Sequence, residues 1–371
     1  MSGPFDTDVF VVGGGPAGLA AAIAARQRGF RTTVADILRL PIDKACGEGL
    51  MPDSVADLAR LGVSLDECEH SWFRGIRFIG PASSVQAEFP RGMGIGVRRT
   101  RLHSALVEHA ERVGVELSWG VRVSGITSSA VRVNGRTVTA RWIVGADGQN
   151  SLVRAWAGLG QGRVFERRMA LRQHFRTPDM PEFVEIHWGE DSQAYLTPVA
   201  PDEICVAIIS RRRLGSFDAE LQRIPTLERR LEQARPSSAV RGALSLSNRL
   251  GRVCIYNVAL VGDASGSVDA ITGEGLALSF RHAVSLADAM VANDLSVYQR
   301  AHRRIEVLPQ FMRRSMLLMD KSATIRHRTL RAFEARPALF ERMLSVHVGE
   351  LPIMRFGARS LASFSWELLR A

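Results

Sequence analysis

The stretch DVFVVGGGPAGLAAAIAARQRGFRTTVAD, residues 8–36, decides the fold class of this 371-residue chain. It opens with a continuous apolar run, residues 9–12, which is typical of a parallel strand covered on both faces. A glycine-rich turn, an alanine-rich helix and a second apolar strand follow. The second strand ends at Asp36, whose carboxylate can accept a hydrogen bond from a ribose hydroxyl. The unit therefore predicts an α/β domain that binds a dinucleotide.

The glycine-rich turn has the pattern GxGxxG. In this pattern Gly13 permits a sharp turn, Gly15 lets a pyrophosphate approach the backbone, and Gly18 lets the helix pack closely on the strand. The helix that begins near Pro16 and Ala17 presents free N–H groups and its positive dipole end to the pyrophosphate. The turn does not distinguish NAD from FAD.

Two later segments have the same order of features: an apolar strand, then a glycine and an acidic residue. WIVGADGQNSLVR, residues 142–154, leads an apolar strand into a turn with Asp147. VALVGDASGSVDAITGEGLALSF, residues 258–280, leads another apolar strand to Asp263 and then to a helix that starts near Gly275. Each segment alone is compatible with an ordinary loop at the edge of a sheet, but both in this order after a GxGxxG turn indicate a specific family.

Over residues 7 to about 285, the chain resembles the FAD-dependent oxidoreductases of the aromatic-hydroxylase fold, the group A flavoprotein monooxygenases, and within them the geranylgeranyl reductase-like branch. The resemblance implies FAD as the cofactor and NADPH or NADH as a transient electron donor. It places Asp147 near FAD and the docking path of NAD(P)H, and Asp263 at the ribityl or pyrophosphate part of FAD. It also points the backbone of Gly275 and Leu276 at the flavin ring, where the helix dipole favours the anionic reduced flavin.

Two further cofactor residues follow from the same resemblance. VRRTRLHSALVEHA, residues 97–110, is similar to the arginine-then-leucine helix start of the family, which places Arg99 near the FAD phosphates. Val123, on the strand WGVRVSGI at residues 119–126, is expected to face the adenine.

The segment DKACGEGLMP, residues 43–52, resembles the Lys-x-Cys-Gly segment that lies along the flavin in the reductase branch. Lys44 offers positive charge near phosphate or reduced flavin, and Gly47 allows the backbone to approach the ring. Cys46 is a candidate catalytic residue at the ring edge, but a small residue that fits a tight loop explains it as well. No pair of cysteines has metal-ligand spacing, so no metal site is expected.

Residues 164–250 contain no nucleotide-binding turn. The segments EFVEIHWG, AYLTPV and EICVAIIS alternate in the way expected of antiparallel strands, and we interpret them as a substrate-binding sheet. His174, His187 and Tyr195 are candidates for acid–base groups. Because such residues more often satisfy local hydrogen bonds, they receive no predicted role.

The domain boundaries follow from these segments. The predicted residues are 1–70, 99–163 and 251–290 for the FAD-binding domain, 164–250 with the β segment 71–98 for the substrate domain, and 291–371 for a helical region. The predicted fold class is α/β: a Rossmann-type FAD-binding domain with an inserted β-rich (α+β) substrate domain and a C-terminal helical region.

The formal net charge is +10, and residues 281–371 hold 15 Lys/Arg against 8 Asp/Glu. A basic helical region with interleaved apolar residues is able to contact an anionic membrane, but a packed cap with a solvated basic face explains the same pattern and is favoured. No nucleic-acid-binding module is recognised, so no nucleic-acid partner is expected. Four scattered cysteines favour the cytoplasm, with peripheral membrane contact left open.

Two reactions remain open. The middle segment resembles a hydroxylase, whereas the Lys-x-Cys-Gly and Thr-Gly-Glu-Gly segments favour reduction. We favour an NAD(P)H-dependent monooxygenase of secondary metabolism, in which oxygen adds to reduced flavin as a hydroperoxide and an apolar aromatic or polyketide-like substrate is hydroxylated. The alternative is reduction of prenyl double bonds, and a more distant one is a non-catalytic flavin-binding sensor or electron carrier.

Overall fold

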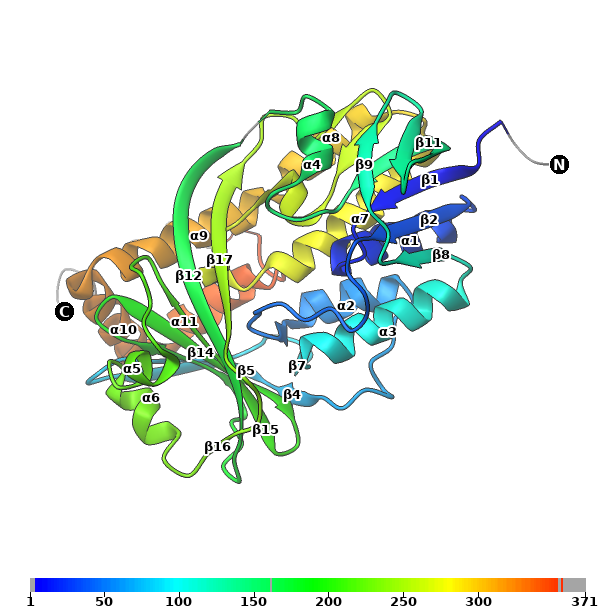
Figure 1. The fold of residues 1–371 in the computed structure, drawn as a ribbon. Coiled ribbons are helices and arrows are strands. Elements are labelled where there is room, and N and C mark those ends of the chain that lie inside the picture. The colour runs from blue at the N-terminus through cyan, green and yellow to red at the C-terminus, as the bar shows by residue number, and fades with distance from the viewer. Residues whose placement is uncertain (1–3, 161, 353–354, 356–371) are drawn as a thin grey trace.

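The computed structural model describes residues 4–160, 162–352 and 355. They form an α/β domain, a second and mostly antiparallel sheet, and a group of C-terminal helices. Figure 1 shows the α/β domain on the right, the second sheet at the lower left, and the C-terminal helices along the left side. The predicted fold class is confirmed.

The first sheet carries the three nucleotide-binding turns. Its strands are β1 (Thr7–Val12), β2 (Thr32–Asp36), β8 (Glu116–Trp119), β9 (Val123–Ile126), β10 (Ala130–Val133), β11 (Arg136–Gly145), β18 (Cys254–Ile255) and β19 (Val258–Leu260). The apolar run of β1 lies in the centre, parallel to β2 and β11, and β11 is parallel to β19. Val12 pairs with Gly145 and Gly145 with Leu260, so the three turns meet at one edge of the sheet.

Helices cover this sheet. They are α1 (Pro16–Gln27), α2 (Pro52–Arg60), α3 (Arg99–Arg112), α4 (Leu152–Trp156) and α7 (Gly275–Val291). α1 packs on α7 and α3, and its alanines are buried in one core cluster with Val9 and Val11. The opposite face of β1, with Phe10 and Val12, packs against β9, β10 and α4. Burial on both faces explains why the strand sequence is apolar without alternation.

The second sheet spans most of residues 164–250. Its strands are β5 (Gly75–Ile79), β6 (Ser84–Glu88), β12 (Arg163–Arg176), β13 (Val184–Trp188), β14 (Ser192–Ala200), β15 (Glu203–Ser210), β16 (Arg235–Pro236), β17 (Arg241–Arg249) and β20 (Gly266–Ser267). Two short helices, α5 (Phe217–Leu221) and α6 (Pro225–Arg230), pack on its outer face. Figure 1 shows β12 and β17 as two long curved strands that run the height of the molecule.

The predicted β segment 71–98 divides between two sheets. β5 and β6 extend the second sheet, whereas β4 (Ser71–Phe73) and β7 (Gly94–Gly96) pair with β3 (Gly49–Leu50) in a small sheet of their own. Two 3-10 turns, η1 (Gly262–Ser265) and η2 (Ala270–Thr272), connect β19 to α7. The domain boundaries remain our assignment.

In the described part of the chain, four helices follow α7: α8 (Leu295–Ile305), α9 (Val307–Lys321), α10 (Ala323–Ala335) and α11 (Pro337–His347). Methionines of α9 and phenylalanines of α10 and α11 pack with Phe78 and Trp188 of the second sheet in one core cluster. No helix in the described ranges is long and apolar enough to cross a membrane. The predicted helical region beyond residue 352 lies outside the described residues, apart from residue 355.

Candidate functional site

The glycine turn after β1 is held closely against the second motif. Gly13 has a φ of +107°, and a Cβ there would lie 2.4 Å from the carbonyl oxygen of Ala146. A Cβ on Gly18 would lie 1.9 Å from the carbonyl oxygen of Gly13. Both positions therefore require glycine, since an L side chain has no space and Gly13 has a left-handed backbone.

Asp36 and a residue not predicted from the sequence hold this turn in shape. The Asp36 carboxylate accepts hydrogen bonds from the backbone N–H groups of Gly14 and Leu38, each at 2.7 Å. The imidazole of His103, on α3, donates from Nε2 to the Gly14 carbonyl at 2.7 Å. Burial lowers the pKa of His103, so the ring is neutral and carries the proton that this bond needs. Asp36 thus orients the turn in addition to its predicted contact with ribose.

The two later acids have different surroundings. Asp147 accepts hydrogen bonds from the hydroxyl of Ser151 at 2.5 Å and from the N–H groups of Leu152 and Val153, so its carboxylate caps α4. Asp263, in η1, lies 3.2 Å from the ammonium of Lys44. The ion pair brings the segment 43–52, which we call the strap, against the third motif.

A narrow gap, without room for a water molecule, lies between the strap and the helix starts. It is lined by Cys46, Glu48, Leu50, Val97, Arg99, Leu102 and Leu276. The buried Nε of Arg99 has no hydrogen-bond partner among the described residues, which leaves a donor free for a cofactor oxygen.

The arrangement fits FAD. A Cβ added at Gly15, Gly47 or Gly275 would meet no atom of the described residues within 4 Å, so bare backbone faces open space at the turn, the strap and the start of α7. Val123 is half-buried and packs against the core of the first sheet. Two residues earlier, the Val121 N–H donates to the Asp36 carbonyl, which links this segment to the end of β2. The contacts of these residues with FAD remain proposals.

Glu48 of the strap joins a polar group that the sequence did not reveal, here called the strap cluster: Glu48, His174, Cys205 and Arg172, which are buried, and Arg98, which is partly exposed. Glu48 accepts from Nε2 of His174 at 2.6 Å. Nδ1 of His174 lies 2.9 Å from a guanidinium nitrogen of Arg98 and of Arg172, so Nδ1 is an acceptor and the proton is on Nε2. Glu48 has a φ of +59°, an uncommon conformation held by these bonds.

The two cysteines at the strap are held by backbone contacts. The Cys205 thiol is fully buried and donates to the Cys46 carbonyl at 3.5 Å, and burial raises its pKa, so it keeps its proton. The Cys46 sulfur accepts from the Glu48 N–H at 3.4 Å. Ligand atoms of Glu48, His174 and Cys205 lie within 4.8 Å of one another. The direct Glu48–His174 bond and the two guanidinium groups disfavour a cation at this place, and we assign no metal to it.

The face of the second sheet next to the strap carries small side chains. Ala170 of β12 pairs with Ala243 of β17, and Ala207 of β15 pairs with Arg172 of β12 and with Tyr195 of β14. Cross-strand partners share a face, so Ala170 and Ala243 lie beside one another. Ala207 lies diagonally from Ala170, whose direct partner on β15 is Ile209. We call the three alanines the alanine floor. The strap cluster lies at one end of this floor.

At the other end, a buried arginine joins three elements. Arg168 of β12 donates to Asp269, just before η2, at 2.6 Å and to Asp320 of α9 at 2.9 Å. We call these three residues the Arg168 clamp; all are buried. The Tyr195 hydroxyl donates to the Ile271 carbonyl at 2.7 Å, and burial raises its pKa, so it keeps its proton. The alanine floor therefore lies between the strap cluster at one end and the Arg168 clamp with Tyr195 at the other.

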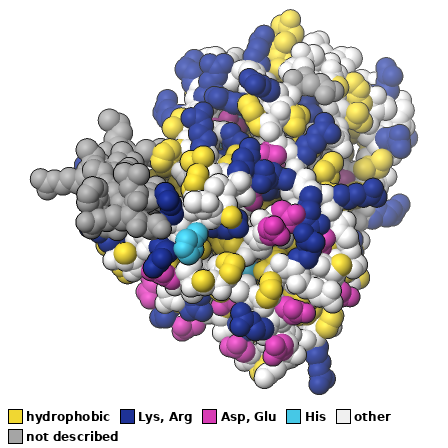
Figure 2. Space-filling view, turned by 90° about the vertical axis from the view of Figure 1, so that its left-hand side faces the viewer, with side chains coloured by type: hydrophobic (Ala, Val, Ile, Leu, Met, Phe, Trp, Pro, Cys, Tyr) yellow, Lys and Arg dark blue, Asp and Glu magenta, His cyan; other side chains and the backbone are white. Residues whose placement is uncertain are grey.

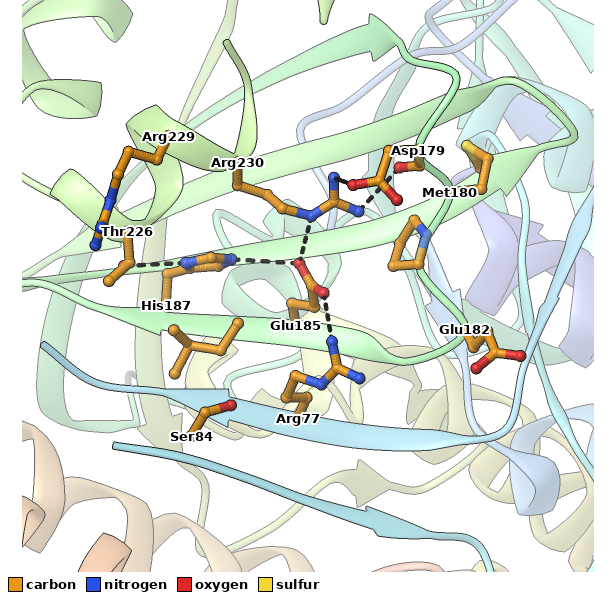
Figure 3. A pocket seen from close by; sticks show the side chains of 12 residues that line it. Arg77, Ser84, Asp179, Met180, Glu182, Glu185, His187, Thr226, Arg229 and Arg230 are labelled. Carbon is orange, nitrogen blue, oxygen red and sulfur yellow. Dashed lines mark hydrogen bonds and ion pairs between the residues drawn. The ribbon is translucent and has the colours of Figure 1, made fainter. Parts of the chain in front are cut away.

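A wider cavity of about 600 Å³ opens on the opposite, outer face of the sheet. Figure 3 shows Glu185 between Arg77 and Arg230, at 3.2 and 3.1 Å, with His187 at 3.4 Å. Burial alone would raise the pKa of Glu185, but the hydrogen bond from His187 and the charge of Arg230 lower it. Because its buried carboxylate is paired and the cavity faces away from the strap, we place the chemistry at the alanine floor. His187 stays without a role.

Comparisons with known proteins agree with this geometry. A family model described as FAD binding domain matches residues 6–296. A menaquinone reductase of Mycolicibacterium smegmatis is 27% identical over 335 residues, which cover 79% of this chain and 78% of the relative. A putative FAD-dependent monooxygenase of Bacillus subtilis is 26% identical, covering 76% and 84%. The solved structure of a flavoprotein/dehydrogenase from Cytophaga hutchinsonii superposes with a TM-score of 0.79 at 18% identity, covering 92% and 93%.

Proposed function

The chain belongs to the FAD-binding domain family and is an FAD-dependent oxidoreductase, and from this premise we propose that it hydroxylates a flat, apolar aromatic or polyketide-like substrate. The observation that carries the proposal is the alanine floor. Ala170 and Ala243 are partly exposed between the strap and η2, and such small side chains leave a level surface on which a ring can lie. When bound, FAD reduced by NADPH or NADH supplies the activation of oxygen.

The residues of the chain would bind the cofactor and orient the substrate. The turn at Gly15 and the start of α1 would hold the pyrophosphate, and the N–H groups of Gly275 and Leu276 would face the flavin ring. The Tyr195 hydroxyl donates its proton to the Ile271 carbonyl and lies at the edge of the floor, so its oxygen would accept a hydrogen bond from a substrate hydroxyl. The strap and the floor together exclude water from the reacting carbon.

Reduction of a prenyl double bond is the second candidate. It is favoured by the buried, protonated Cys205 thiol and the Nε2 proton of His174 beside the strap, because alkene reduction needs a proton donor as well as electrons. The Mycolicibacterium relative is likewise named a reductase, of menaquinone.

Product masses separate these reactions. FAD-loaded protein is reduced with NADPH and mixed with an alkylated phenol or a prenylated quinone, with and without oxygen. Gain of one oxygen atom, only in air, supports hydroxylation. Gain of two hydrogen atoms that persists after any quinol formed has been reoxidised to the quinone supports reduction of the prenyl double bond. Oxidation of NADPH with unchanged substrate would contradict both and favour an electron carrier.

A pair of variants tests the site itself. Ala170→Leu places a branched side chain on the floor and should lower hydroxylation at least about tenfold while FAD content stays normal. Cys205→Ala removes the buried thiol and should leave hydroxylation within about threefold. If instead Cys205→Ala abolished reduction of the prenyl double bond and Ala170→Leu left that reduction normal, the site would be assigned to proton donation and thus to reduction.

A further inference from the structure

Helix α9 exposes apolar side chains on its outer face. Val307, Phe311 and Leu318 are 59%, 40% and 58% exposed, and Arg314, also exposed, lies among them. Their spacing of four, three and four residues puts all four side chains on one face of the helix. The opposite face packs with its methionines against the second sheet, so the stripe is not required for the core. We call these four residues the α9 stripe.

The stripe continues onto the outer end of β12. Phe165 is 43% exposed, and its ring lies under the guanidinium groups of Arg163 and Arg313, at 5.5 and 5.4 Å from the ring centroid. Lys321, at the end of α9, lies 3.4 Å from Glu166. An exposed ring in contact with two cations thus lies beside a helix that carries three further exposed apolar side chains.

The exposed charge on α8 and α9 themselves has one sign. Within residues 295–321, every exposed charged side chain is basic: Arg300, Arg303, Arg304, Arg314 and Lys321. The two acids of this range, Glu306 and Asp320, are buried. Figure 2 shows basic and hydrophobic side chains interleaved over the upper half of this side of the molecule, whereas acidic side chains gather mostly in the lower half.

We propose that α9 and the outer end of β12 dock on an anionic phospholipid bilayer. Exposed phenylalanine and leucine side chains insert at the boundary of headgroups and acyl chains, and arginines beside them pair with lipid phosphates. The proposal concerns where the protein works and does not depend on which reaction it performs. Since Asp320 of α9 binds Arg168, the docking helix is also bound to the sheet that carries the alanine floor. A lipid-soluble substrate would then reach the site from the membrane.

Vesicle binding tests the proposal. The full chain with FAD bound is sedimented with vesicles of phosphatidylcholine alone or with phosphatidylglycerol added, at low salt and at about 0.5 M salt. Wild type should bind only the anionic vesicles, and high salt should weaken binding. Arg314→Gln should weaken it about fivefold, as expected for one cation near the surface. The double variant Phe311→Ser and Leu318→Ser should weaken it at least about tenfold.

Tyr256→Ser is the matched control, because Tyr256 is 86% exposed between β18 and β19 on the first sheet. It should bind vesicles as wild type does, and all variants should retain FAD. Equal binding to neutral and anionic vesicles, or unchanged binding of the α9 variants, would overturn the proposal. A dimer that dissociates in the Phe311→Ser and Leu318→Ser variant would assign the stripe to a second copy of the chain instead.

Discussion

Lys44 is one of two lysines in the chain, and its ammonium is 3.2 Å from Asp263 at the third motif. The pair is partly exposed, so on its own it contributes at most about 1 kcal/mol to folding. We propose that Lys44 also places a positive charge where the phosphates of FAD would approach the strap. A hydrogen bond to a charged group is worth about 1.5–3 kcal/mol.

Lys44→Met should therefore weaken FAD binding about tenfold at low salt and less at about 0.5 M salt, because the lost interaction is electrostatic. Fluorescence titration of the apoprotein with FAD measures this change. The other lysine, Lys321 on α9, provides the control, since Lys321→Met removes the same charge on another element. If both variants bound FAD equally well, the positive charge at the strap would have no part in cofactor binding.

At the scale of elements, α9 is bound to the second sheet and to η2 through the Arg168 clamp. Arg168 and Asp269 are at most 2% exposed and Asp320 is 6% exposed, so the charges are shielded from water. Asp320 also lies 3.1 Å from Nε of Arg211, so without it two arginines share the single carboxylate of Asp269. Breaking a buried ion pair in this way typically costs about 3–5 kcal/mol.

Asp320→Ala should accordingly lower the free energy of unfolding by about 3 kcal/mol, measured by urea denaturation with FAD bound. Lys321→Ala, one residue further on the same helix, removes only a partly exposed pair with Glu166 and should cost less than about 1 kcal/mol. Similar costs for the two variants would show that the clamp does not stabilise α9 on the sheet.

These elements differ in how far sequence patterns predict them. β1, α1 and β2 depend on local signals, and each lies where the pattern places it. Arg168, Arg172 and His174 of β12 lie at even spacing, so they share one face of the strand. Their partners were not predictable, because Glu48 is 126 residues from His174 and Asp320 is 152 residues from Arg168. Contacts at such separation depend on how the sheets and helices pack together.

At the scale of the whole molecule, one buried carboxyl makes stability depend on pH. Glu274, directly before α7, is 4% exposed, and its Oε2 finds no hydrogen-bond partner in the described part of the chain. Burial raises its pKa from 4.5 to about 8; a hydrogen bond from Thr272 and the charge of Arg281 act in the opposite direction, and the charge of Asp53 raises it further. Glu274 is therefore protonated in the folded protein at neutral pH.

This shift lowers stability as pH rises. Below about pH 4.5 both folded and unfolded states hold the proton, and Glu274 carries no penalty. Between pH 4.5 and 8 the unfolded state loses the proton while the folded state keeps it, so the free energy of unfolding falls by up to about 1.4 kcal/mol per pH unit. Glu274→Gln has no proton to lose and should remove this slope. Relative to wild type, the variant should gain stability from pH 5 to pH 7.5 in urea denaturation, whereas Glu341→Gln on the exposed face of α11 should not. A constant difference between Glu274→Gln and wild type over this range would mean that Glu274 is ionised in the folded protein.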